Sequence, residues 1–193
     1  HTYIHAVEES PYPDRALQAA DALRGLKIFT PSFGHLVHMP AHIYVRTGNF
    51  QRSVESNEQT ATMPTDTLSE EFRLWHYNHV LNFLLFSYAM QGNSAMVSKT
   101  LDRKFGFYAP RYSDQRPRYW VRFKRWDDIL NAPSPPADSR PATLVGWAFA
   151  KAMAFAVKGD AEKAAIERAK LRPDDSALWK LDDFRVEAAI ARL

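Results

Sequence analysis

The sequence predicts an all-α fold built from helical hairpins, and two observations support this prediction. Long alternating runs of β-branched residues are missing, and so are the Asn-Gly and Asp-Gly pairs that are typical of β-hairpins. Helical periodicity is common instead, and glycines end several of the periodic segments. The same order therefore recurs along the chain: a helix, a glycine turn, a second helix and often a proline.

Start and stop signals divide the chain into segments. Pro13 and Asp14 suit the first turn of a helix, and a long helix that begins near Ser69 ends at Gly92. The prolines of residues 131–142 mark a loop. Helices are predicted over residues 13–26, 40–48, 49–63, 69–92, 94–105, 115–130, 143–159, 160–171 and 174–193.

Residues 34–67 have a specific arrangement of small, aromatic and turn residues. A small residue lies within each of two helices, two aromatic residues flank a glycine turn, and a proline ends the unit. These residues are Ala41, Tyr44, Gly48, Phe50, Ser53 and Pro64. The arrangement resembles the tetratricopeptide repeat, a helix-turn-helix unit of about 34 residues.

This resemblance extends over most of the chain and implies an irregular array of helical hairpins, an α-solenoid. The turn glycines Gly48, Gly92 and Gly159 are unevenly spaced, so insertions between repeats are expected. We expect a single helical-repeat domain over residues 1–193. Its approximate units are 1–30, 34–67, 69–105, 113–133 and 142–175, with a terminal helix over 176–193.

The stretch HMPAHI, residues 38 to 43, carries a narrower resemblance. With its flanking sequence it is similar to a group of bacterial tetratricopeptide-repeat proteins that share an HMP-[AS]-HI motif and have no assigned reaction. Members of this group are usually longer, so this chain is expected to be part of a longer protein. They commonly have a further histidine where this chain has Asn82.

The composition excludes several classes of function. The chain has no cysteine, which excludes disulfides, thiolate metal sites and thiol catalysis. Its formal net charge of +3 is too small to indicate a partner. No apolar run reaches the roughly 18 residues of a membrane span, and no signal peptide is visible. A soluble protein is expected, either cytoplasmic or periplasmic.

The basic and aromatic segment RYWVRFKRW, residues 118 to 126, suggests nucleic acid as a partner, because such mixtures grip single strands. Tyr119, Phe123 and Trp126, however, are spaced as the core-facing stripe of a helix. A packed helix with an arginine-rich outer face is the favoured interpretation, and nucleic acid binding is not expected.

The histidines are the most unusual feature, because all seven lie between residues 1 and 79. His35, His38 and His42 are spaced i, i+3 and i+7, which places them on one face of a helix. Pro40 interrupts this stripe. We therefore expect either a helix that starts near His38 or a helix that bends at Pro40.

The repeat resemblance implies that the first helix of each unit lines a concave groove. Counting back from the turn glycines, and aligning Ala16 with Ser53 in the first unit, places histidines from three consecutive helices on groove positions. Packed helices lie about 8–10 Å apart, so these imidazoles can share an ion. The candidate metal ligands are His1, His5, His35, His38, His42 and His79, the further pocket residues are Arg46, Asn82 and His76, and Glu8 and Glu9 lie nearby.

These residues predict a site for a transition metal such as Zn, Cu or Fe, because imidazole suits these ions. A catalytic version would activate water, with Glu8 or Glu9 as the base. Two alternatives stay open. In one, a groove that includes Arg46 binds an anionic peptide or another carboxylate ligand, as part of a protein-binding scaffold without catalytic activity. In the other, the histidines form only a polar network that holds the repeats together.

Overall fold

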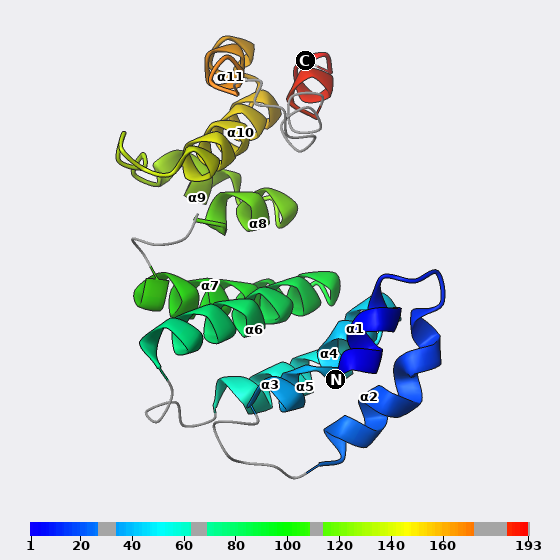
Figure 1. Cartoon of the computed structure of the whole chain (residues 1–193). Helices are drawn as coiled ribbons and strands as arrows, with labels where there is room; N and C mark the ends of the chain where they lie inside the picture. Colours follow the sequence, from blue (N-terminus) through cyan, green and yellow to red (C-terminus); the bar gives the residue numbers. More distant parts are fainter. Residues whose placement is uncertain (27–33, 63–68, 109–113, 172–184, 193) are drawn as a thin grey trace. The chain divides into compact units, whose positions relative to one another are not determined.

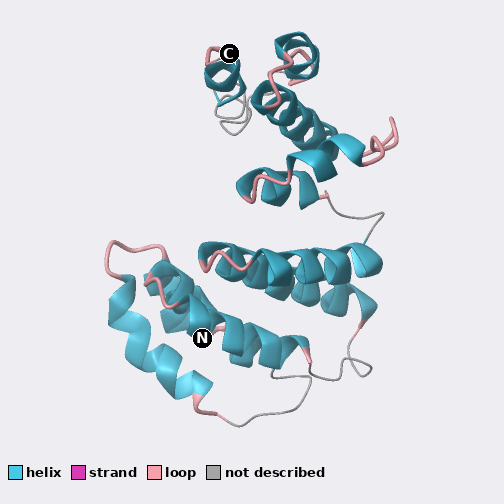
Figure 2. Cartoon of the chain, turned by 180° about the vertical axis from the view of Figure 1, so that it is seen from behind, coloured by secondary structure: helices cyan, strands magenta, loops and turns pink. Residues whose placement is uncertain are grey.

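The computed structural model describes residues 1–26, 34–62, 69–108, 114–171 and 185–192. Helices are the only regular secondary structure in these ranges, which confirms the predicted all-α class (Figures 1 and 2). The chain divides into two compact units, His1–Tyr108 and Ala109–Leu193. None of the helices in the described ranges has both the length and the apolar character needed to cross a bilayer.

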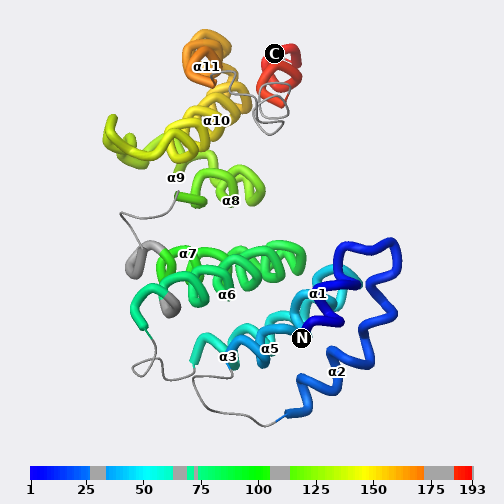
Figure 3. The backbone as a smooth tube through the Cα atoms, viewed as in Figure 1, coloured from blue at the N-terminus to red at the C-terminus, as the bar shows by residue number. Residues whose placement is uncertain are grey.

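Pro40–Arg46 forms a short helix, α4, which packs against α1, α2, α5 and α6 (Figure 1). A long helix, α6, packs against both α5 and α7 (Figure 3). The remaining elements are α1 (Thr2–Glu8), the 3-10 turn η1 (Pro13–Ala16), α2 (Leu17–Arg24), α3 (Gly34–His38), α5 (Phe50–Ala61), α6 (Glu70–Met90) and α7 (Ser94–Tyr108).

The second unit is organised around α10, Pro141–Val157, which packs against three other helices. These are α8 (Arg116–Arg122), α9 (Trp126–Asn131) and α11 (Ala161–Arg168). The proline-rich residues between α9 and α10 form a loop, as predicted. Of the predicted helix 174–193, residues 185–190 are helical, whereas residues 174–184 lie outside the described ranges.

Four helical hairpins turn in the same way. In the α4–α5 hairpin the amide of Asn49 donates to the carbonyl of Tyr44 at 2.8 Å, and Gly48 between them has a φ of 75°. This backbone hydrogen bond closes a Schellman motif, which needs one residue in the left-handed region. The equivalent bonds run from Asn93 to Tyr88, from Asp160 to Phe155 and from Arg125 to Trp120.

The last of these turns contradicts the predicted helix over residues 115–130. The helix ends at Arg122, Lys124 adopts a φ of 56°, and a new helix begins at Trp126. Lys124 therefore stands where the other three hairpins have glycine. The prediction failed because it relied on glycine as the stop signal, whereas here a lysine adopts the left-handed conformation that ends the helix.

Opposite substitutions at two of these turns are expected to have opposite effects on stability. Gly48→Ala places a side chain in the left-handed region and should destabilise the protein by about 1–2 kcal/mol. Lys124→Gly relieves the same strain and should stabilise it by about 0.5–1 kcal/mol. Urea unfolding followed by circular dichroism measures both changes. Gly146→Ala is the comparison for Gly48→Ala: Gly146 is helical and a Cβ there meets nothing within 4 Å, so the same exchange should stabilise the protein by about 0.5–1 kcal/mol.

Two faces of the helical run through α3 and α4 have different surroundings. Met39 and Ile43 are fully buried against Ile4, Ala16 and Ala20, which belong to α1, η1 and α2. These contacts form the apolar core of this part of the unit, and they fix the rotation of α4. The histidines of the same run project from a neighbouring face.

The helical run is divided into α3, which ends at His38, and α4, which begins at Pro40. The amide of Met39 donates to the carbonyl of His35 at 3.0 Å, and the amide of His42 donates to the carbonyl of Met39 at 3.2 Å. Pro40 has no amide proton and occupies the first turn of α4, where none is needed. Met39, between the two helices, keeps helical backbone angles, with a φ of −49° and a ψ of −38°.

Candidate metal centre

All seven histidines of the chain lie in the first unit, and their rings form one contiguous cluster. The ring of His38 is within 6.1 Å, centroid to centroid, of the rings of four other histidines. Helix α1 begins at the cluster with His1 as its N-cap. The cluster consists of His1 and His5 from the α1 segment, His35 and His38 from α3, His42 from α4, and His76 and His79 from α6.

Three of these residues form the group that we call the inner triad, His38, His42 and His79. The Nε2 atoms of His38 and His42 are 3.0 Å apart, and the Nε2 atoms of His42 and His79 are 3.4 Å apart. His38 is completely buried and His42 is 6% exposed. Three imidazole nitrogens thus converge on a small space between α3, α4 and α6.

Asn57 of α5 fixes the proton position on His38. The Nδ2 group of Asn57 donates to the carbonyl of Ser53 at 2.8 Å, so its Oδ1 faces His38. That oxygen is 2.7 Å from Nδ1 of His38 and can only accept a hydrogen bond. Nδ1 of His38 therefore carries the proton, and Nε2 presents a lone pair to the triad.

Glu8 has the same effect on two other histidines. Its two carboxylate oxygens accept hydrogen bonds from Nδ1 of His5, at 2.6 Å, and from Nδ1 of His42, at 2.5 Å. Burial raises the pKa of Glu8, but the hydrogen bonds from the two histidines outweigh it, so the pKa is lowered overall. An ionised Glu8 thus holds Nδ1 of each histidine as the donor, and Nε2 of each ring points away from the carboxylate.

Burial favours the neutral form of the two buried rings of the inner triad. It holds the pKa of His38 well below its usual value, and neighbouring histidines lower it further. Burial also lowers the pKa of His42, although its hydrogen bond to Glu8 opposes this. The Nε2 lone pair of His38 points at Nε2 of His42, 3.0 Å away, so these two atoms share either a proton or a cation.

The distances between neighbouring nitrogen and oxygen atoms show which of them can bind one ion together and which are joined by a hydrogen bond. A tetrahedral ion with bonds of about 2.0–2.1 Å to nitrogen holds its ligand atoms roughly 3.3 Å apart. The Nε2 separations in the inner triad, 3.0 and 3.4 Å, match this spacing. The contacts of Glu8 with His5 and His42, 2.6 and 2.5 Å, are too short for ligands of one ion and are hydrogen bonds.

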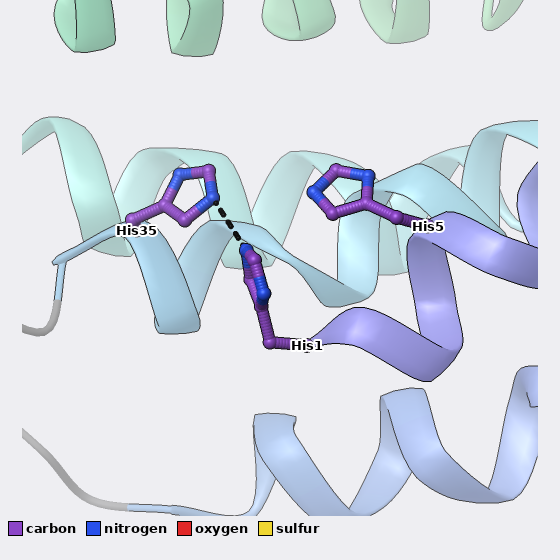
Figure 4. Close-up of side chains that lie close together, drawn as sticks. All are labelled: His1, His5 and His35. Carbon is purple, nitrogen blue, oxygen red and sulfur yellow. Dashed lines mark hydrogen bonds between the residues drawn. The ribbon is translucent and has the colours of Figure 1, made fainter.

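A second group, which we call the outer triad, consists of His1, His5 and His35 (Figure 4). The Nε2 atoms of His1 and His35 are 3.1 Å apart, and the ring of His5 lies 4.9 Å from that of His1. His1 and His5 are exposed, whereas His35 is half-buried. Burial, together with the surrounding histidines, lowers the pKa of His35 to about 4.

No protein-family model, curated protein or solved structure matches this chain. The interpretation of the histidine cluster therefore rests on its own geometry.

Two aromatic residues of α6 enclose the inner triad. The ring of Phe83 lies 4.8 Å from His38, 4.7 Å from His42 and 5.0 Å from His79. On another side, Trp75 stacks on His79 with a ring separation of 5.7 Å and an interplanar angle of 7°. An apolar wall of this kind limits the access of water to a metal and its ligands.

The other predicted pocket residues have different surroundings. His76 is buried beside His35, with ring centroids 5.5 Å apart, but it belongs to neither triad. Arg46 donates through Nε to the backbone carbonyl of Glu8 at 2.7 Å, and so ties α4 to the end of α1. Asn82 accepts a hydrogen bond from Nζ of Lys104 on α7. Glu9 is exposed and belongs to none of the candidate ligand groups among the described residues.

Sequence reasoning did not identify Asn57 or Phe83 as parts of the site. Asn57 belongs to a row of buried polar residues on α5, and the row itself was the available signal. Its members, Ser53, Ser56, Asn57 and Thr60, recur at helical spacing on the face where an amphipathic helix normally has apolar residues.

Proposed function

We propose that the first unit of this protein binds a transition metal ion through His38, His42 and His79. The observation that carries this proposal is the convergence of three Nε2 atoms, separated by 3.0 and 3.4 Å, in a largely buried place. Asn57 and Glu8 hold the opposite ring nitrogens of His38 and His42 as donors, which is the arrangement that orients metal-bound histidines. A cation among these atoms would be bound by their lone pairs without adding a proton to a buried ring.

The ligand set restricts the ion. Imidazole nitrogens without thiolates suit Zn²⁺, Cu²⁺ and Fe²⁺ better than Mg²⁺ or Ca²⁺. Three protein ligands leave a coordination position for water or a substrate, as in catalytic rather than structural zinc sites. Both carboxylate oxygens of Glu8 accept hydrogen bonds, from His5 and from His42. This argues against Glu8 as the base that would activate a metal-bound water. We therefore propose metal binding, and the open coordination position extends this proposal to a metal-dependent reaction.

We also propose that the helical hairpins belong to a tetratricopeptide-like array. Four hairpins with the same Schellman turn, each with an aromatic residue accepting the closing hydrogen bond, support this. The buried small residues Ala41 and Ser53 in the α4–α5 hairpin also support it.

The decisive experiment measures metal bound to purified, chelator-treated protein after reloading and desalting. We expect a stoichiometric ion in the wild type. His79→Ala should weaken binding by more than the roughly 100-fold that loss of a supporting hydrogen bond costs, because it removes a direct ligand. Met90→Ala, an exposed position on the same helix, is the control and should bind normally.

The fluorescence of Trp75 provides an independent measurement of metal binding. Its ring stacks on His79 and is 50% exposed, so Cu²⁺ bound at the inner triad should quench its fluorescence. Trp75→Phe should abolish this part of the signal while leaving the ion bound. A protein that takes up none of Zn²⁺, Cu²⁺ and Fe²⁺ at micromolar concentration would overturn the proposal, and so would a His79→Ala variant that binds as tightly as the wild type.

A further inference from the structure

The outer triad has the features of a second ion site, separate from the inner one. His1, His5 and His35 each offer a ring nitrogen, and these atoms all lie within 4.8 Å of one another. The pair from His1 and His35 is 3.1 Å apart, close to the spacing of ligands on one tetrahedral ion. None of these three residues belongs to the inner triad.

Glu8 links the two triads through one histidine of each. One of its oxygens accepts from His5 of the outer triad, and the other accepts from His42 of the inner triad. Both histidines are thereby held with Nε2 available as a ligand atom. A single carboxylate thus provides, for two sites, the supporting contact that metal-binding histidines usually have.

The two triads are in direct ring contact. The rings of His5 and His42 are 5.0 Å apart, and those of His35 and His38 are 5.9 Å apart. From this geometry we infer that the cluster is a two-ion centre, in which the outer triad binds a second transition metal ion beside the first. This inference rests on the proposed function, because it takes the inner triad as the first site.

Burial and charge predict an order of binding. The inner triad has two buried rings, whereas His1 and His5 of the outer triad are exposed. Glu8 is the one carboxylate in the candidate ligand groups of the described residues, so two divalent ions share a single negative charge. The second ion therefore binds more weakly than the first and exchanges more readily with solution.

Zinc titration against a chromophoric chelator tests this inference. Wild-type protein should bind two equivalents of Zn²⁺ in two steps. His1→Ala should retain one tight equivalent, and His79→Ala should lose the tight step. Thr2→Ala is the matched control, because it replaces an exposed neighbour of His1 that offers no ligand. Circular dichroism checks that each variant is folded.

Electron paramagnetic resonance with Cu²⁺ supplies a second measurement. Because the triads are in ring contact, a second equivalent should broaden the spectrum of the wild type but not that of His1→Ala. One tight equivalent in both proteins would overturn the two-ion centre and leave the proposed function standing. No binding in either protein would overturn both. Two equivalents in His1→Ala would overturn the assignment of the second site to the outer triad.

Discussion

Replacing Glu8 with alanine is expected to lower the affinity for Zn²⁺ by about 10–100-fold, the usual cost of losing a residue that orients a metal-bound histidine. The number of ions bound should not change, because Glu8 is not itself a ligand. The reason is structural: without Glu8, the Nδ1 groups of His5 and His42 lose their acceptor, and their rings are no longer held in one orientation. Competition with a chelator of known affinity measures the change.

Two further variants sharpen this experiment. Glu8→Gln keeps one oxygen that accepts a hydrogen bond, so its affinity should fall between those of the wild type and Glu8→Ala. Glu9→Ala removes the neighbouring exposed carboxylate and should have no effect. If Glu8→Ala instead loses a whole equivalent of metal, then Glu8 is a direct ligand and the division into two triads is wrong.

Acidification from pH 7 to pH 5 is expected to destabilise the first unit when metal is kept away with a chelator. Burial lowers the pKa of His38 well below 6.5, and it lowers the pKa of His79, as of His35, to about 4. At a pH between these lowered values and the ordinary pKa of 6.5, the unfolded chain therefore binds more protons than the folded one. The free energy of unfolding therefore decreases as the pH is lowered through this window.

The protein contains its own control for this experiment. All seven histidines lie in the first unit, so the second unit has none to titrate. Urea unfolding at the two pH values, followed at amides of each unit by hydrogen exchange, should show the loss only in the first. Equal losses in both units, or a first unit as stable at pH 5 as at pH 7, would contradict the neutral state assigned to the buried rings.

Much of this site could be predicted from the sequence, because the spacing of residues along a helix determines which face of the helix they occupy. Counting back from Gly48 selected His38 and His42, and both lie in the inner triad. The same counting did not divide the histidines into two groups. That division depends on the distances between the ring nitrogens, which follow from the packing of helices that lie apart in the sequence.

An unusual backbone conformation could be predicted only where the residue type favours it. Gly48, Gly92 and Gly159 mark their turns because glycine tolerates positive φ, whereas Lys124 adopts the same conformation without any compositional signal. Pro40 was identified as the position where the stripe would be interrupted, and α4 begins there, in a first turn that needs no amide from it. The sequence thus predicted the position of this irregularity.

The buried hydrogen bonds of Ser53 connect the histidine cluster to the packing of α5 on α6. Asn57 holds His38 and also donates to the carbonyl of Ser53, whose hydroxyl is 2.8 Å from that of Ser87 on α6. Sliding α5 along its neighbour by one residue would break the serine pair and would carry Asn57 away from the imidazole in the same movement. The register of α5 on α6 and the tautomer of His38 are consequently linked, because Ser53 and Asn57 of the same helix hold both.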